Sequence, residues 1–204
     1  MSATVHDDHT GITFRETMAG GFKLGVTDPA LGAAGPQQLA MHATIQIADI
    51  DAFTHSAGHQ AQLSGSIDFE PMGMGMVADS GVFGLFSPSG DPALTYMVYE
   101  LGFAHGGQRW YLAGKKHVKL GSPLRLWGET TTLFTTLHQG VDATGPVAGA
   151  GVLSLGVVDL LKLMGTVKAT DSSGLGESAS AIAKFFRFFA SELSRTYVLN
   201  QPKA

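Results

Sequence analysis

The residues of this sequence that could do chemistry together lie on two neighbouring segments near its middle. In "LWGETTTLF", Leu126–Phe134, strand alternation places Glu129 on the same face as Trp127 and Leu133. In "RWYLAGKKHVKL" the same alternation places Lys116 among apolar residues. A carboxylate or an ammonium group on an apolar face is costly alone and tolerated as a hydrogen-bonded pair. The two residues therefore predict a buried ion pair.

One hairpin register would bring the two charges together. If "GSPL" forms a four-residue loop, Lys116 opposes Glu129, with Cβ atoms about 5 Å apart. A second four-residue loop, "HGGQ", places Tyr99 opposite Gly114, where the tyrosine ring could cover the bare glycine. A bulge at Gly128 would instead turn Glu129 outward and leave Lys116 without this partner.

The predicted pair has a structural and a functional interpretation. It could simply support the fold, or it could form the polar end of an apolar cavity, because small-molecule sites are mostly apolar with a few placed polar groups. The run "PMGMGM" could then be a flexible apolar lip, since methionine adapts its shape, or a plain core turn. The functional interpretation predicts these ligand-binding residues: Tyr99, Lys116, Glu129, Trp127, Met74 and Met76.

Motifs for metals, cofactors and nucleophilic catalysis do not match this sequence. His55 and His59 have a spacing that suits a metal on a helix, but Gly58 lies between them and the segment reads as a solvated loop. There is no dinucleotide fingerprint, phosphate-binding loop or nucleophile elbow. The absence of cysteine excludes disulfides and thiolate metal sites. We therefore predict no metal, no cofactor and no catalytic residue.

Composition excludes further classes of partner and points to a compartment. The formal net charge is −4 and no basic tract suggests nucleic acid. No run approaches the roughly 18 apolar residues of a membrane span. The first residues, "MSATVHDDHTG", lack the apolar region of a secretory signal. We expect a cytoplasmic protein, with peripheral membrane contact left open.

Hydrophobic periodicity predicts one β-rich domain with a helix at its end. Residues 1–11 are interpreted as a disordered lead and 12–204 as a single domain, which the length of 204 residues allows. Short alternating segments separated by Gly- and Pro-containing turns favour an antiparallel β-barrel or sandwich. A C-terminal amphipathic helix at about 177–198 would close it. Its apolar face is expected to comprise Ile182, Phe185, Phe186, Phe189, Leu193 and Tyr197.

Several stretches resemble a β-rich accessory domain that occurs beside cholesterol-oxidase-like flavoproteins of the glucose–methanol–choline oxidoreductase family. They include "YMVYELGF", "YLAGKKHV", "LWGETTTLF" and the closing "FFRFFASELSRTYV", and the resemblance covers about residues 12–198. Tyr99, Lys116 and Glu129 fall on positions of its motifs, with Glu in place of Asp at the last. The flavoprotein part, with its FAD fingerprint, is missing. The resemblance implies sterol or other lipid-like ligands and supplies no catalytic residues.

Three functions follow as hypotheses. The first is a non-catalytic binding or accessory domain for a hydrophobic, lipid- or sterol-like ligand. The second is an interaction module that docks on a separately encoded flavoprotein oxidoreductase or hydrolase. The third is a small enzyme that uses Lys116 and Glu129 as acid and base.

Overall fold

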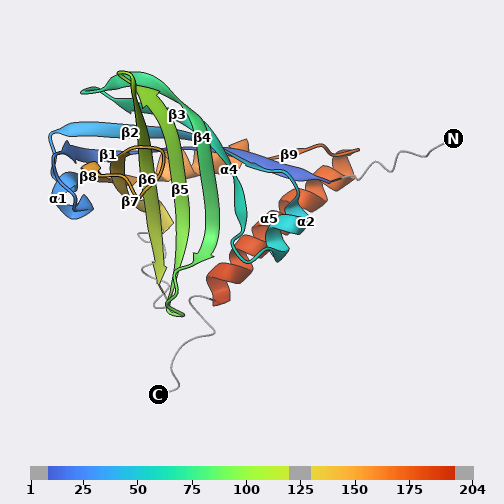
Figure 1. The fold of residues 1–204 in the computed structure, drawn as a ribbon. Coiled ribbons are helices and arrows are strands. Elements are labelled where there is room, and N and C mark those ends of the chain that lie inside the picture. Colours follow the sequence, from blue (N-terminus) through green and yellow to red (C-terminus); the bar gives the residue numbers. More distant parts are fainter. Residues whose placement is uncertain (1–8, 120–129, 196–204) are drawn as a thin grey trace, which may run out of the picture.

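The protein is built on a closed barrel of eight antiparallel strands, to which a ninth short strand is added (Figure 1). The computed structural model describes residues 9–119 and 130–195. Each barrel strand pairs with the next along the chain, and β1 pairs with both β2 and β8, which closes the sheet. The strands are β1 (Gly11–Leu24), β2 (Gln37–Ile47), β3 (Gln60–Phe69), β4 (Gly73–Pro88), β5 (Leu94–His105), β6 (Gln108–Lys119), β7 (Thr132–Gln139) and β8 (Val147–Ser154), with β9 (Lys168–Thr170) beside β1.

The barrel interior is a packed apolar core because the strands alternate between apolar and polar residues. In β2 the alternate residues Met41, Ala43, Ile45 and Ile47 are all buried. The strand ends at Ile47, and Asp49 caps the next helix by accepting from two backbone N–H groups. The prediction of a mainly β fold is confirmed, and the sheet forms a barrel rather than a sandwich.

The hairpin between β5 and β6 has the predicted register. Tyr99 lies opposite Gly114, and His105 pairs with Gln108 across a two-residue turn. Gly106 and Gly107 both have positive φ, at 59° and 74°. Glycine supplies this backbone conformation without steric cost, which is why "GG" suits a tight hairpin turn.

The register predicted between β6 and β7 is wrong by four residues. Gly114 lies opposite Thr135, whereas a "GSPL" loop would place it opposite Thr131. β6 ends at Lys119 and β7 begins at Thr132. Because the shift is an even number, every side chain keeps its face of the sheet, and apolar alternation does not distinguish the two registers. Glu129 and Trp127 lie outside the described residues.

Helices cover the two ends of the barrel. On one side α1 (Pro29–Ala33) packs on β1 and β8, and on the other α5 (Leu175–Ser194) lies beside α2 (Ile50–His55) (Figure 1). Helix α4 (Val157–Thr166) packs against β1. None of the described helices is long and apolar enough to cross a membrane.

Helix α5 confirms the predicted amphipathic helix within the described residues. Glu177 in its first turn accepts hydrogen bonds from the backbone N–H and the hydroxyl of Ser173, which ties the helix to the residue just before its N-cap, Gly174. Ala181 and Phe185 are buried, and the other expected apolar residues pack against the core. Tyr197 lies outside the described residues.

Substitution of one barrel glycine is expected to destabilise the fold. A Cβ atom at Gly65 in β3 would lie 1.9 Å from the carbonyl oxygen of His42 in β2, so Gly65→Ala must force two paired strands apart. We expect a loss of about 2–3 kcal/mol in the free energy of unfolding. Urea unfolding followed by circular dichroism measures it.

Gly176→Ala is the matched control. Gly176 lies in the first turn of α5, and a Cβ atom there meets nothing within 4 Å. Alanine should stabilise the protein by about 0.5 kcal/mol through its higher helix propensity. Equal effects of the two substitutions would contradict the close strand packing at Gly65.

Candidate functional site

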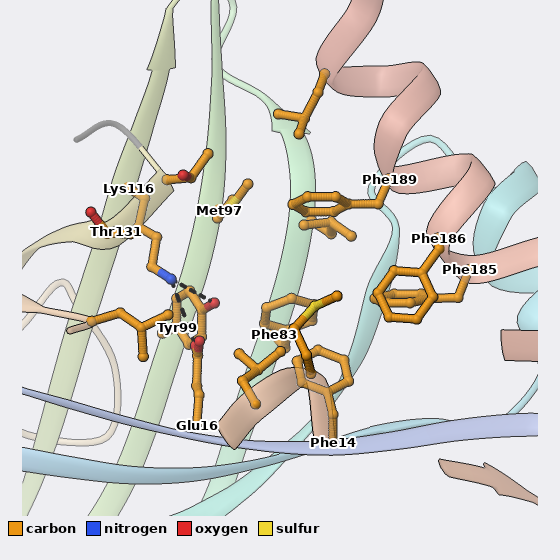
Figure 2. A pocket seen from close by; sticks show the side chains of 16 residues that line it. Phe14, Glu16, Phe83, Met97, Tyr99, Lys116, Thr131, Phe185, Phe186 and Phe189 are labelled. Carbon is orange, nitrogen blue, oxygen red and sulfur yellow. Dashed lines mark hydrogen bonds and ion pairs between the residues drawn. The ribbon is translucent and has the colours of Figure 1, made fainter. Parts of the chain in front are cut away.

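An apolar cavity of about 360 Å³ lies between the barrel interior and the helices at one end (Figure 2). Side chains from β1, β4, β5, β6, α4 and α5 form its wall. Much of the wall is aromatic, with Phe14 and Phe83 from the barrel facing Phe185, Phe186 and Phe189 from α5. Every second residue of a strand points into the barrel, and residues three or four apart share one face of a helix. The wall forms where these inward strand residues meet the apolar face of α5.

A polar cluster of three residues forms one part of this wall. The Nζ atom of Lys116 donates to the hydroxyl oxygen of Tyr99 at 3.0 Å and lies 3.7 Å from Oε1 of Glu16 (Figure 2). The side chains of Lys116 and Glu16 are 3% and 2% exposed. A charged pair so fully removed from water is stable only because each member has a partner.

Barrel closure brings the three residues together. Tyr99 and Lys116 come from neighbouring strands, β5 and β6, and both point inward by alternation. Glu16 comes from β1, and two strands, β7 and β8, lie between β1 and β6 in the sheet. The Lys116–Glu16 pair therefore spans the barrel interior, unlike the cross-strand pair predicted with Glu129.

Burial controls the protonation of the cluster. Burial lowers the pKa of Lys116, and the negative charge of Glu16 opposes this effect. Burial, followed by the charge of Glu16, raises the pKa of the Tyr99 hydroxyl well above its usual value of 10.0. Tyr99 thus keeps its proton throughout the neutral range and can donate it in a hydrogen bond. The cluster can orient a polar ligand group or exchange protons with it.

Two of the predicted ligand-binding residues line the cavity, and two others do not. Tyr99 and Lys116 meet at the cavity as expected. Met74 and Met76 lie at the start of β4 and are not among the residues that line the cavity. Met74 is 69% exposed, and Met76 packs against the core. Met97 and Met164 supply the methionines of the wall instead.

The remaining predicted residues, Glu129 and Trp127, lie outside the described part of the chain. The hairpin register from which the Lys116–Glu129 pair was predicted is wrong, and the use of the two residues as acid and base stays a prediction. Thr130 and Thr131, from the same "LWGETTTLF" stretch, line the cavity.

Glu16 was missed from the sequence, although a signal was present. In "ITFRETMAG", Ile12, Phe14, Glu16 and Met18 share one strand face, and all four are buried. The alternation rule that singled out Lys116 would have placed Glu16 inside as well. Its pairing with Lys116 could not be inferred from hairpin geometry, because the two strands are not neighbours.

A second polar constellation lies on the outer surface of the barrel. The hydroxyl oxygen of Thr17 lies 3.1 Å from Nδ1 of His42. The other ring nitrogen of His42, Nε2, lies 3.0 Å from Oδ2 of Asp68. The order hydroxyl, imidazole and carboxylate is that of an activated nucleophile. However, His42 is 42% exposed, and the surrounding backbone of β1, β2 and β3 is committed to the sheet ladder. The group is better described as a cross-strand polar chain on the barrel surface.

The other histidines of interest do not form a metal site. The Nδ1 atoms of His55 and His59 contact the carbonyl oxygens of Asp51 and Phe53. Among the described residues, no group of three potential ligands could hold a metal ion.

A comparison of the chain with known protein families, characterised proteins and solved structures finds no match. The resemblance to the flavoprotein-associated accessory domain therefore stays a prediction. Function is therefore inferred from the geometry of the cavity and its polar cluster.

Removal of the buried ammonium group is expected to destabilise the protein. Lys116→Met keeps a long apolar side chain but leaves the Glu16 carboxylate buried opposite no cation. We expect a loss of about 3–5 kcal/mol in the free energy of unfolding, measured in urea. Adding Glu16→Gln should restore a large part of that loss, because the second change removes the uncompensated charge.

Lys115→Met is the control for this experiment. Lys115 is adjacent in sequence, but its side chain is exposed on the opposite face of β6. Its Nζ atom lies 5.2 Å from the centre of the Tyr96 ring, and loss of this exposed cation–π contact should cost no more than about 1 kcal/mol. A loss in Lys116→Met no greater than that in Lys115→Met would show that the buried pair does not contribute.

High pH is expected to reveal the protonated Tyr99. Because its pKa is raised in the folded state, the associated stability is complete below pH 10.0 and is lost as the pH rises through the folded-state value. Tyrosinate absorbance in the ultraviolet should therefore gain the contribution of Tyr99 only when circular dichroism shows unfolding. In Tyr99→Phe, the absorbance gained on unfolding at high pH should be smaller by the contribution of one tyrosine. The absorbance change that occurs while the protein is still folded should be the same as in wild type.

Wild-type protein unfolded in urea supplies the reference titration, in which Tyr99 ionises near its ordinary pKa. A smaller absorbance change in folded Tyr99→Phe than in folded wild type would contradict the burial of this hydroxyl.

Proposed function

We propose that this protein is a non-catalytic binding or accessory domain for a hydrophobic, lipid- or sterol-like small molecule. The ligand occupies the cavity between the barrel and α5, with its polar end at Tyr99, Lys116 and Glu16. The observation that carries the proposal is an apolar cavity whose wall contains one fully buried polar cluster. Sites for small molecules commonly combine these two features.

The dimensions of the barrel limit the size of the ligand. An eight-stranded barrel is wide enough to be filled by side chains or to hold one small ligand. The volume of about 360 Å³ lies near the lower end of the range for small-molecule pockets. A single acyl chain or a compact ring system suits this volume better than a lipid with two chains.

Most of the cavity wall is apolar and therefore favours a ligand that is apolar along most of its length. Phe83, Leu85 and Met97 of the barrel and Phe185 and Phe189 of α5 offer no side-chain hydrogen bond. Transfer of an apolar ligand from water to this surface gains roughly 25 cal/mol for each Å² buried. The lipid-like class agrees with the expectation from the sequence resemblance.

Helix α4 supplies the proposed mouth of the cavity. Met164 lines the cavity and is also 51% exposed, so its side chain touches both the cavity and solvent. Leu163, beside it in α4, lines the same wall and packs against the core. A flexible methionine at this position can move aside for a ligand without repacking the barrel.

Blocking the mouth should weaken binding. Met164→Trp places a larger side chain at the rim, where its partial exposure limits the cost to folding. Titration with the neutral fluorophore N-phenyl-naphthylamine should give a dissociation constant in the micromolar range for wild type. The variant should bind about tenfold more weakly, a difference of about 1.4 kcal/mol.

Met74→Trp is the matched control, because Met74 is a similarly exposed methionine that does not line the cavity. It should bind the fluorophore as wild type does. The purified protein should also release a hydrophobic compound on extraction with organic solvent, detectable by mass spectrometry. If no compound is extracted and no fluorophore binds at micromolar concentration, the proposed function is wrong.

A further inference from the structure

One oxygen of the polar cluster has an unfilled hydrogen-bonding position. Oε1 of Glu16 is buried and accepts no hydrogen bond from the described residues, and Glu16 is one of the residues that line the cavity. Its nearest cation, Nζ of Lys116, lies at 3.7 Å, which is an ion-pair distance and too long for a hydrogen bond. Buried polar atoms are nearly always satisfied, so this carboxylate oxygen calls for a donor from a molecule in the cavity.

The neighbouring ammonium group of Lys116 can donate a hydrogen bond to a ligand. A lysine ammonium group has three N–H donors, and that of Lys116 donates to Tyr99 and faces Glu16 as its ion-pair partner. Counting only partners in the described part of the chain, one N–H donor of Lys116 therefore remains for a ligand atom. A group that fits beside both residues must donate to Glu16 and accept from Lys116.

The charge of the cluster limits the groups that qualify. Lys116 and Glu16 together carry no net charge, whether the proton lies on the lysine or on the glutamate. A ligand carboxylate would add a second negative charge next to Glu16 in a site removed from water, which is unfavourable. An ether or ketone oxygen could accept from Lys116 but would leave Oε1 of Glu16 without a donor.

A hydroxyl group meets every one of these requirements, because it is neutral and both donates and accepts. We therefore infer that the cavity selects apolar molecules that end in a hydroxyl group, and that it discriminates against the corresponding carboxylates. The inference rests on the proposed function and specifies its ligand class. A long-chain alcohol and a hydroxylated ring system share this chemistry.

The test is displacement of N-phenyl-naphthylamine at neutral pH by three ligands of nearly equal size. Decanol donates and accepts, methyl nonyl ether has the same number of heavy atoms but does not donate, and decanoate is an anion. We expect decanol to displace the fluorophore at a concentration about tenfold lower than decanoate. The ether should be several-fold weaker than decanol, since it leaves the Glu16 oxygen unsatisfied.

The variant Glu16→Gln tests the residue directly. Removing the carboxylate charge removes its repulsion of a ligand anion beside Lys116, so decanoate should gain about tenfold in affinity and the preference for decanol should disappear or reverse. Glu100→Gln is the control. Glu100 lies on the outer face of β5, where its carboxylate accepts a hydrogen bond from the hydroxyl of Tyr111 in β6. This variant should retain the wild-type order of the three ligands.

The outcomes separate the inference from the function on which it rests. If neither the fluorophore nor any ligand binds, the proposed binding function fails and the inference with it. If the fluorophore binds but decanoate displaces it as well as decanol does, the inference is overturned and the binding function stands. If Glu16→Gln does not fold, the order of the three ligands on wild-type protein decides alone.

Discussion

The structure depends on the closure of the sheet at β1. This strand pairs with β2 along its length and with β8 near its end, so the eight strands form a barrel with no open edge between them. Closure removes backbone groups that would otherwise need another partner. It also sets β1 across the interior from β6, and that placement brings Glu16 to Lys116.

The polar cluster of Tyr99, Lys116 and Glu16 lies in the buried interior of the barrel, where any polar atom without a partner costs free energy. In a low-dielectric interior a paired charge is tolerated, whereas an unsatisfied acceptor costs the full desolvation penalty of the group. Lys116 donates a hydrogen bond to the hydroxyl oxygen of Tyr99, while one oxygen of Glu16 has no hydrogen-bond donor among the described residues. A cluster that served the fold alone would gain stability from filling that position with a protein side chain. The open acceptor beside an apolar cavity is the feature that favours a ligand.

Helix α5 completes the cavity by covering one end of the barrel. Its apolar face supplies three phenylalanines to the wall, and Lys184 on its exposed side pairs with Asp51 of α2. The other end is filled by large buried side chains such as Phe22, Phe69 and Phe103. The barrel is thus filled at one end and contains a cavity at the other, and the buried Lys116 and Glu16 line that cavity.

Local periodicity was enough to predict a mainly β fold, the inward faces of β5 and β6, the Tyr99–Gly114 pairing and the C-terminal helix, but not the strand that contains the Met/Gly run at the start of β4. These features depend on residues close in sequence, where a period of two or 3.6 residues fixes which side chains face the core. The β6–β7 register and the partner of Lys116 could not be obtained in this way. A four-residue slip leaves every face unchanged, and Glu16 lies 100 positions before Lys116 on a strand that is not its neighbour. The sequence alone determined that a lysine must be buried and paired, whereas the closed three-dimensional fold selected Glu16 and left one of its oxygens without a hydrogen-bond donor among the described residues, beside a cavity.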